Sequence, residues 1–126
     1  MGFVPETGVN YMNSTLEEVS LSDQAIKNSN FELNTCIFNA HMDRILIEES
    51  NFTEKVGFYN TKLNAAQIKH TIFSDRIYFK RSDFTEMFMI YTTFSKSVSF
   101  FRANFTRSEI KFSKFTNNVT FINSIF

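Results

Sequence analysis

The sequence has no tryptophan, one cysteine, one proline and three glycines among its 126 residues. The single cysteine, Cys36, excludes an internal disulfide framework and favours a reducing, cytoplasmic location. So little glycine and proline argues against a turn-rich β-sandwich. No run approaches the roughly 18–20 apolar residues of a membrane span, and no secretion signal is visible. We therefore expect neither a membrane-spanning segment nor secretion.

Neither sign of charge predominates, since 13 lysines and arginines balance 13 aspartates and glutamates. The balance does not hold along the chain. Residues 1–63 contain nine acids and four bases, whereas residues 64–126 contain four acids and nine bases. Net charges of −5 and +5 in the two halves predict that the folded chain is an electric dipole.

Phenylalanine is abundant instead, and most of its 17 residues follow one periodic pattern. Large residues recur every 21 positions in four series, separated by steps of six, five, five and five residues. The series are Phe31, Phe52, Phe73, Phe94 and Phe115; Ile37, Phe58, Phe79, Phe100 and Phe121; Met42, Leu63, Phe84, Phe105 and Phe126; and Ile26, Ile47, Ile68, Met89 and Ile110. Neither helical periodicity nor strand alternation produces this repeat, so we predict a solenoid.

The position two residues before each large residue is also restricted. It is small before the third series (Ala40, Thr61, Ser82, Ala103, Ser124) and before the first (Ser50, Thr71, Thr92, Ser113). After the six-residue step it is larger and mostly β-branched (Thr35, Val56, Ile77, Val98, Val119). Each column keeps its own character along the chain, as expected of stacked turns.

Several five-residue units, such as Ala103-Asn104-Phe105-Thr106-Arg107 and Ser82-Asp83-Phe84-Thr85-Glu86, resemble those of pentapeptide-repeat proteins. The resemblance covers roughly residues 14–126 and implies an all-β fold, a right-handed quadrilateral parallel β-helix of about five turns. It implies that the large residue and the small one before it point inward. The six-residue step adds one residue to the family's usual turn. We therefore expect a bulge at one corner, with Ser or Thr after the preceding Phe (Thr53, Ser74, Ser95, Thr116).

Stacked turns explain the columns physically. Parallel strands lie about 4.8 Å apart, and this spacing suits offset stacking of like aromatic rings. The inward Ser and Thr hydroxyls would be buried, so we expect them to bond backbone groups.

The ends of the repeat are less regular. We predict an N-terminal cap over residues 1–13 and an irregular first turn over 14–30, where Gln24 occupies a position for a small inward residue. Ser14 or Thr15 could instead begin a capping helix, and the irregular turn is the favoured alternative. At the other end Phe121 and Phe126 lie in core columns, which predicts an end-to-end contact with another copy or another protein.

Two outward clusters are unexpectedly apolar. One column contains Phe38, Tyr59, Lys80, Phe101 and Ile122, and a second cluster contains Phe88, Ile90, Tyr91 and Phe112. We predict partner-binding residues among them: Phe38, Tyr59, Phe101, Ile122, Phe88 and Tyr91. Alternatively, the six-residue corner folds back over them, or the aromatics merely favour β structure.

Basic residues gather in the second half, at Arg76, Lys80, Arg81, Arg102 and Arg107. This charge patch would suit an acidic partner. We expect an acidic protein rather than nucleic acid. The alternatives are a solvated face and head-to-tail stacking of copies.

Catalytic chemistry has little support. His41 and His70 have no second ligand at metal-binding spacing, and Cys36 has no neighbouring base. A flat solenoid face should offer no cleft. We therefore expect no enzyme, cofactor, metal or small-molecule substrate, and predict a non-enzymatic interaction or scaffold protein. The resemblance also implies an alternative, a mimic of duplex DNA that binds a type II topoisomerase. Such a mimic needs an acidic rod, and zero net charge with a basic second half argues against it.

Overall fold

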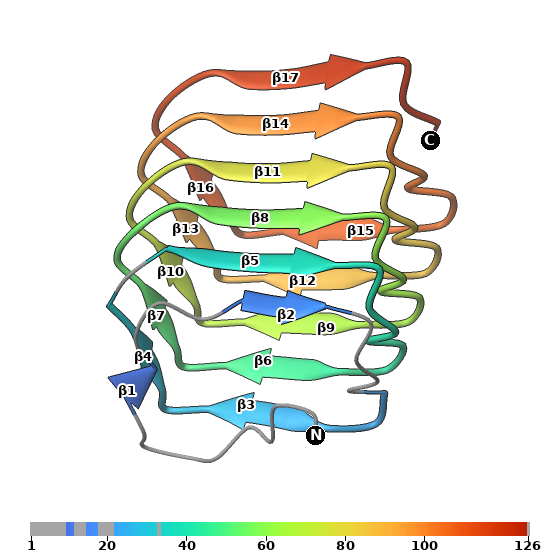
Figure 1. Ribbon diagram of the computed structural model, residues 1–126. Coiled ribbons are helices and arrows are strands. Elements are labelled where there is room, and N and C mark those ends of the chain that lie inside the picture. Colours follow the sequence, from blue (N-terminus) through green and yellow to red (C-terminus); the bar gives the residue numbers. More distant parts are fainter. Residues whose placement is uncertain (1–9, 12–14, 18–21, 33, 126) are drawn as a thin grey trace.

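The computed structural model describes residues 10–11, 15–17, 22–32 and 34–125, and these contain no helix. Seventeen short strands form three parallel sheets, and single bridges between turns form a fourth side. Figure 1 shows a right-handed four-sided β-solenoid that rises from the N-terminal strands to the C-terminal ones. The predicted all-β fold is confirmed.

Each side of the solenoid takes one short segment from every turn. Sheet 1 contains β1 (Asn10–Tyr11), β4 (Asn30–Phe31), β7 (Asn51–Phe52), β10 (Ile72–Phe73), β13 (Thr93–Phe94) and β16 (Lys114–Phe115). Sheet 2 contains β2 (Thr15–Glu17), β5 (Thr35–Phe38), β8 (Val56–Tyr59), β11 (Ile77–Lys80), β14 (Val98–Phe101) and β17 (Val119–Ile122). Sheet 3 contains β3 (Ala25–Lys27), β6 (Leu46–Glu48), β9 (Gln67–Lys69), β12 (Phe88–Ile90) and β15 (Glu109–Lys111). The fourth side, here the bridge face, pairs His41, Lys62, Asp83, Asn104 and Ile125 from turn to turn.

The strands pair in a constant register of 21 residues. Phe79, for example, pairs with Phe58 in the turn before and with Phe100 in the turn after. The first turn is the exception, because Tyr11 pairs with Phe31, an offset of 20 residues. The extra residue between sheets 1 and 2 is therefore absent from that turn.

The core consists of stacked rings, as the sequence predicts. In sheet 1 the ring centroids of Phe31 and Phe52 lie 4.3 Å apart, with an interplanar angle of 10°. In sheet 2 Phe79 stacks on Phe100 at 5.0 Å. Phe84 meets the edge of Phe79 at 4.7 Å and 84° and so joins the bridge-face column to that of sheet 2. These rings are fully buried in the middle turns, and such pairs contribute beyond their buried area.

Buried hydroxyls satisfy the backbone around these rings. Thr61 Oγ1 donates to the carbonyl of Tyr59 at 3.1 Å, and Thr92 Oγ1 donates to that of Ile90 at 3.2 Å. Among the described residues every buried side-chain nitrogen or oxygen has a partner. At the six-residue corner Thr53 Oγ1 and Thr116 Oγ1 donate to the carbonyls of Phe31 and Phe94, both at 3.1 Å.

The other three corners turn through left-handed backbone. Among the described residues, fifteen non-glycine residues with positive φ occupy these corners. One corner, between sheet 2 and the bridge face, contains Asn39, Asn60, Arg81, Arg102 and Asn123; a second, between the bridge face and sheet 3, contains Asp23, Arg44, Ala65, Glu86 and Arg107; the third, between sheets 3 and 1, contains Asn28, Glu49, His70, Tyr91 and Phe112. Asn and Asp tolerate this conformation, whereas longer and bulkier side chains are unfavourable there.

The ends differ in part from the predictions. Thr15–Glu17 is a strand paired with β5, so the capping-helix alternative is wrong for these residues, and Gln24 is exposed rather than inward. Asn10–Tyr11 pairs with β4, while the rest of the predicted cap and Phe126 lie outside the described residues. At the other end the core columns emerge into solvent, with Phe121 46 % exposed.

Candidate interaction face

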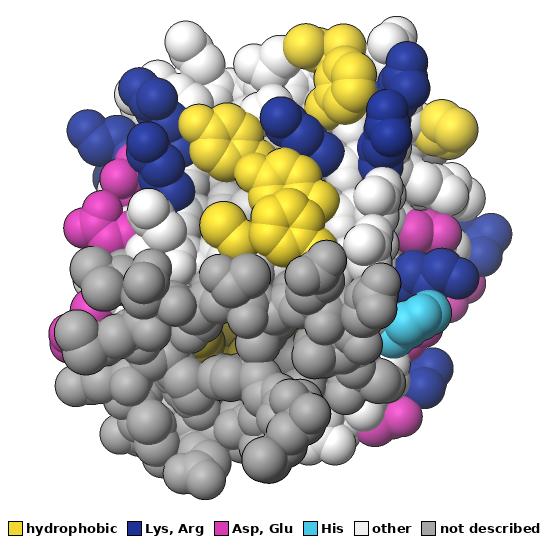
Figure 2. All heavy atoms as spheres, in the orientation of Figure 1, with side chains coloured by type: hydrophobic (Ala, Val, Ile, Leu, Met, Phe, Trp, Pro, Cys, Tyr) yellow, Lys and Arg dark blue, Asp and Glu magenta, His cyan; other side chains and the backbone are white. Residues whose placement is uncertain are grey.

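The outer face of sheet 2 carries the predicted aromatic column. Alternation along each strand buries Thr35 and Ile37 and turns Cys36 and Phe38 outward. The strand register then aligns Phe38, Tyr59, Lys80, Phe101 and Ile122 from turn to turn. Figure 2 shows hydrophobic side chains gathered over this sheet, with lysines and arginines on both sides of them.

The column begins with two stacked rings. The centroids of Phe38 and Tyr59 lie 4.9 Å apart, at an interplanar angle of 13°. The Tyr59 ring lies across Gly57, where an added Cβ would be only 2.5 Å from its Cε2 atom. Burial raises the pKa of the Tyr59 phenol, and Cys36 and Tyr78 raise it further. The glycine therefore lets this ring lie flat against the sheet.

Lys80 interrupts the aromatic column. Its Nζ lies 5.8 Å from the centroid of the Tyr59 ring and 5.9 Å from that of Tyr78, within cation–π range. The column resumes at Phe101, where the guanidinium of Arg102 lies 5.3 Å from the ring centroid. One cation thus separates the rings of this column, and a second lies against the ring that follows it.

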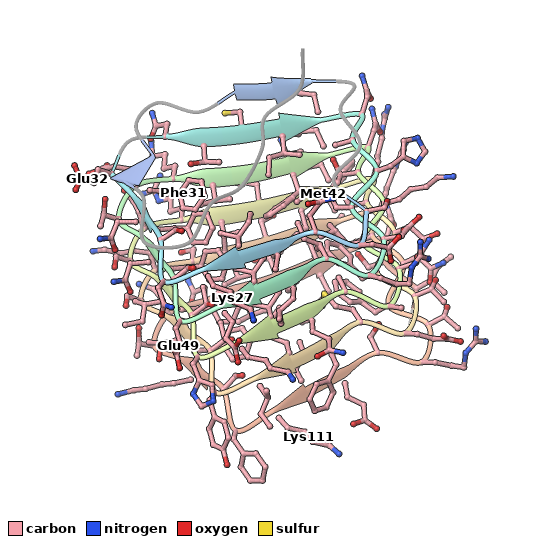
Figure 3. The ribbon with its side chains drawn as sticks, turned by 90° about the horizontal axis from the view of Figure 1, so that it is seen from below. Lys27, Phe31, Glu32, Met42, Glu49 and Lys111 are labelled. Atoms are coloured by element: carbon pink, nitrogen blue, oxygen red, sulfur yellow. The ribbon has the colours of Figure 1, made fainter. Side chains whose placement is uncertain are left out.

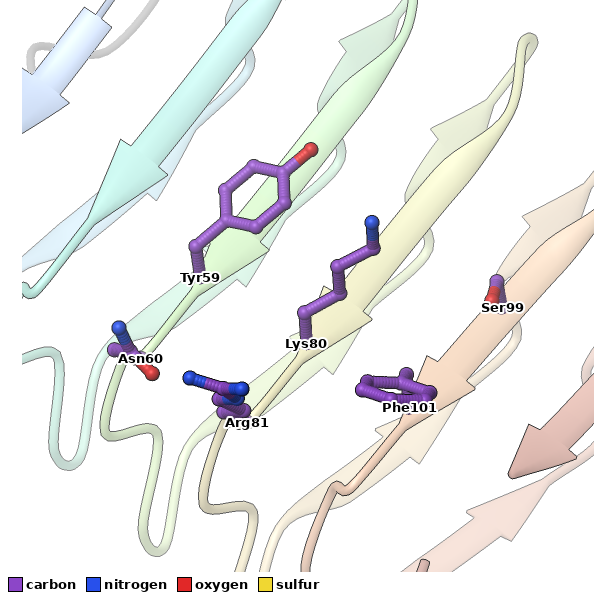
Figure 4. A pocket seen from close by; sticks show the side chains of 6 residues that line it. All are labelled: Tyr59, Asn60, Lys80, Arg81, Ser99 and Phe101. Carbon is purple, nitrogen blue, oxygen red and sulfur yellow. The ribbon is translucent and has the colours of Figure 1, made fainter. Parts of the chain in front are cut away.

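A shallow hollow of about 360 Å³ opens where the lysine replaces a ring. Its lining residues are Tyr59, Asn60, Lys80, Arg81, Ser99 and Phe101 (Figure 4). The expectation that a solenoid face offers no cleft is wrong here, because Lys80 is slimmer than the rings of Tyr59 and Phe101 on either side of it, and Ser99 is smaller than Tyr78 in the turn before. The lining contains two cations and no carboxylate.

Four of the five predicted basic residues border this face. Arg76 lies near the six-residue corner and Lys80 within the column, while Arg81 and Arg102 occupy the opposite corner. No ion pair joins any of these four to an acidic side chain within the described part of the chain. Arg107 belongs elsewhere, since it lies at the corner with sheet 3, where its Nη2 is 2.8 Å from Glu86.

The second predicted cluster lies on another side of the molecule. Phe88 is on the outer face of sheet 3, with Lys111 Nζ 6.0 Å from its ring centroid, and Tyr91 follows at the next corner. The sequence missed one relation here, that His70 stacks on Tyr91 at 5.1 Å. Their spacing of 21 residues was the available signal. These residues do not join the sheet 2 face.

No cluster of three or more potential metal ligands occurs in the part of the chain that the structure describes. His41 and His70 are both exposed. Within the same residues there is also no helix long and apolar enough to cross a membrane.

Comparison with known proteins supports the fold. No family model matches the sequence, and a search of the curated proteins gives no match. Among solved structures the chain is similar to QnrB1, a plasmid-mediated fluoroquinolone resistance protein, with a TM-score of 0.52 and 8% sequence identity. The match covers 96% of this chain and 73% of that one. It confirms the predicted resemblance to pentapeptide-repeat proteins at the level of the fold.

Proposed function

We propose that this chain is a non-enzymatic protein-interaction module that binds an acidic segment of a partner protein on the outer face of sheet 2. One observation carries the proposal: a half-buried, outward-facing aromatic column flanked by cations that have no acidic partner among the described residues. Aromatic residues and arginine are the side chains enriched at the energetic centres of protein interfaces.

Charge decides the kind of partner. Lys80 and Arg81 line the hollow, and Arg102 lies against the ring of Phe101. An apolar segment without carboxylates would therefore bury or crowd these cations without compensation. A segment that combines carboxylates with an aliphatic or aromatic side chain complements both the cations and the apolar hollow. The apolar side chain would occupy the hollow between Tyr59 and Phe101, and the carboxylates would meet the flanking arginines.

The C-terminal rim is a second proposed contact. β15, β16 and β17 each pair on one side only among the described strands. A hollow of about 200 Å³ there is lined by Phe105, Arg107, Ser108, Ile110 and Phe121. The rim fits strand addition by a partner protein or by another copy, and the rigid rod would then act as a scaffold between its two contacts. The lone Cys36 leads us to place the protein in the cytoplasm.

Peptide selection tests the sheet 2 face directly. Random peptides displayed on phage are selected against the immobilised chain, and calorimetry gives the affinities of the enriched sequences. We expect acidic peptides that contain an aromatic or aliphatic residue. The double variant Phe101→Ser/Arg102→Gln should weaken their binding about tenfold or more.

Lys62→Gln is the matched control, because it removes one exposed positive charge from the bridge face, outside both proposed contacts. It should leave the affinity within about twofold. Enriched peptides that bind the double variant as tightly as the unmodified chain would refute the proposed face. So would a selection that yields no acidic consensus.

Binding to a type II topoisomerase is the lesser alternative. The structural similarity to a quinolone resistance protein is the reason to consider this function. The zero net charge and the basic second half argue against it. We expect no protection of gyrase from quinolones in a supercoiling assay. Clear protection would make this alternative the leading one.

A further inference from the structure

A second exposed aromatic ladder follows the corner between sheets 3 and 1. His70 stacks on Tyr91 at 5.1 Å and 18°, and Tyr91 stacks on Phe112 at 5.3 Å and 17°. Tyr91 is 51 % exposed and Phe112 73 %. The proposed binding face does not use this ladder, because it lies at the corner diagonally across the solenoid from Arg81 and Arg102.

The ladder occupies unfavourable backbone. His70, Tyr91 and Phe112 have φ of 48°, 50° and 51°, where the Cβ of an L-residue is crowded. The first described turn has Asn28 at the same position, a residue that tolerates this conformation. Folding alone therefore favours asparagine along the whole corner. Large rings held in strained backbone and exposed to water point to a binding role.

The residues beside the ladder change character along the rod. On sheet 3 the neighbours in successive turns are Lys27, Glu48, Lys69, Ile90 and Lys111, and Glu49 precedes His70 in the corner column. Glu48 lies 4.0 Å from Lys27, and Lys111 lies 2.8 Å from Glu109. Ile72 adds a further exposed apolar side chain beside the ladder, at 42 %. Figure 3 looks onto sheet 3 and labels Glu49 and Lys111 toward the two ends of this strip. The N-terminal end of the strip thus has one net negative charge, from Glu48, Glu49 and Lys27, whereas the C-terminal end has Lys111 beside the two large rings.

We propose that this strip binds a second copy of the chain in antiparallel orientation, which closes a two-fold dimer. In a straight solenoid each outward column is a line of residues parallel to the rod. A two-fold axis that lies in the interface, across the rod, places every column against its own reverse. With the axis between the turns of His70 and Tyr91, the repeat register sets Glu48 opposite Lys111 of the second copy.

The same axis brings the aromatic residues into contact. His70 faces Tyr91 of the second copy, and Glu49 lies opposite Phe112 of that copy. The dimer removes the exposed rings from water and places the acidic half of one rod beside the basic half of the other. A parallel arrangement would instead set like charges together. The face of sheet 2 stays free, so the dimer and the acidic partner can bind at once.

Sedimentation equilibrium over a range of concentrations tests the ladder. The double variant Tyr91→Asn/Phe112→Asn should raise the dimer dissociation constant about tenfold or more. Asparagine suits the left-handed corner, so this variant should keep the circular dichroism spectrum and melting temperature of the unmodified chain or exceed them. A loss of dimer could then not be attributed to unfolding.

Charge reversal tests the antiparallel register. Glu48→Lys and Lys111→Glu should each weaken the dimer, and their combination should restore it, because the reversed charges again face each other. A combination that dimerises no better than the single variants would refute this register. A chain that is monomeric at every concentration would refute the dimer.

Two further variants separate this contact from the other proposed surfaces. Phe101→Ser alters the sheet 2 face and Phe121→Asp alters the C-terminal rim, and both should leave the antiparallel dimer intact. If self-association is lost in either of them and kept in the corner variant, the corner is not the interface. Peptide binding to sheet 2 is measured separately and can fail without affecting this result.

Discussion

The two halves of the rod share an interior and differ on the outside. Phe58 in the first half and Phe100 in the second are both 1 % exposed and stack on Phe79 at 5.2 and 5.0 Å. At the corner after sheet 2, by contrast, the first half has Asn39 and Asn60, and the second has Arg81 and Arg102 before Asn123. The repeat thus specifies the core in every turn, while outward positions vary independently of it.

The difference carries a cost in the second half. Arginine, tyrosine and phenylalanine at left-handed corners are less favourable than asparagine by about 1 kcal/mol each. The same half holds most of the cations without a described acidic partner and the most exposed rings. Features that oppose folding and groups suited to binding therefore coincide at Arg81, Arg102, Tyr91 and Phe112, which the sheet 2 face and the antiparallel dimer use.

A matched pair of core truncations tests the shared interior and has the largest expected effect. Phe58→Ala and Phe100→Ala each remove a fully buried ring from the same column. Each should lower the free energy of unfolding by about 3–5 kcal/mol, because the cavity between flanking turns cannot close without breaking the register. Urea denaturation followed by circular dichroism measures both. A difference of several kcal/mol between them would mean that the halves do not share one core.

Buried hydroxyls give a second matched pair with a smaller effect. Thr61 Oγ1 donates to the carbonyls of Tyr59 and, at 3.5 Å, Ile37, and Thr92 Oγ1 donates to those of Ile90 and, at 3.4 Å, Ile68. Thr→Val keeps the shape at either site and removes the donor. We expect a loss of about 1–2 kcal/mol in each half, measured in the same denaturation experiment. Valine variants as stable as the parent would show that these hydrogen bonds contribute nothing net.

The interior was predictable because it repeats. Five phenylalanines at a step of 21, from Phe31 to Phe115, can meet only if turns stack, and the rings stack as expected. The six-residue corner was predictable for the same reason. Its absence from the first turn, where Tyr11 pairs with Phe31, was not, since one turn offers no repetition to compare.

The exterior was only partly predictable. Alternation identified the outward column from Phe38 to Ile122, but neither the hollow beside Lys80 nor the position of Tyr59 across Gly57 follows from spacing. Arg107 was grouped with the other basic residues because it is near in sequence. Its actual neighbour is Glu86, 21 residues earlier, so the repeat spacing was the signal that could have paired the two side chains.

Two opposite exchanges at the corner after sheet 2 should change the free energy of unfolding in opposite directions. Arg102→Asn should stabilise the fold by about 0.5–1 kcal/mol, and Asn60→Arg should destabilise it by a similar amount, because the left-handed backbone is retained in both. Thermal unfolding of the two variants, at matched salt concentration, measures the shifts. Arg102→Asn that destabilises the chain would show that the arginine is a structural residue rather than a binding one.

The pH dependence of Tyr59 is the smallest expected effect. Burial, Cys36 and Tyr78 raise its pKa above the unfolded value of about 10. The resulting stabilisation is therefore complete below that unfolded value and is lost as the pH rises through the folded pKa. The difference between the alkaline absorbance titrations of the parent and of Tyr59→Phe isolates this phenol. Cys36→Ala should shift its midpoint part of the way back, because the thiolate no longer opposes the phenolate. A midpoint at or below the ordinary value would mean that the Tyr59 ring does not lie against sheet 2. The proposed aromatic column would then not have the packing described here.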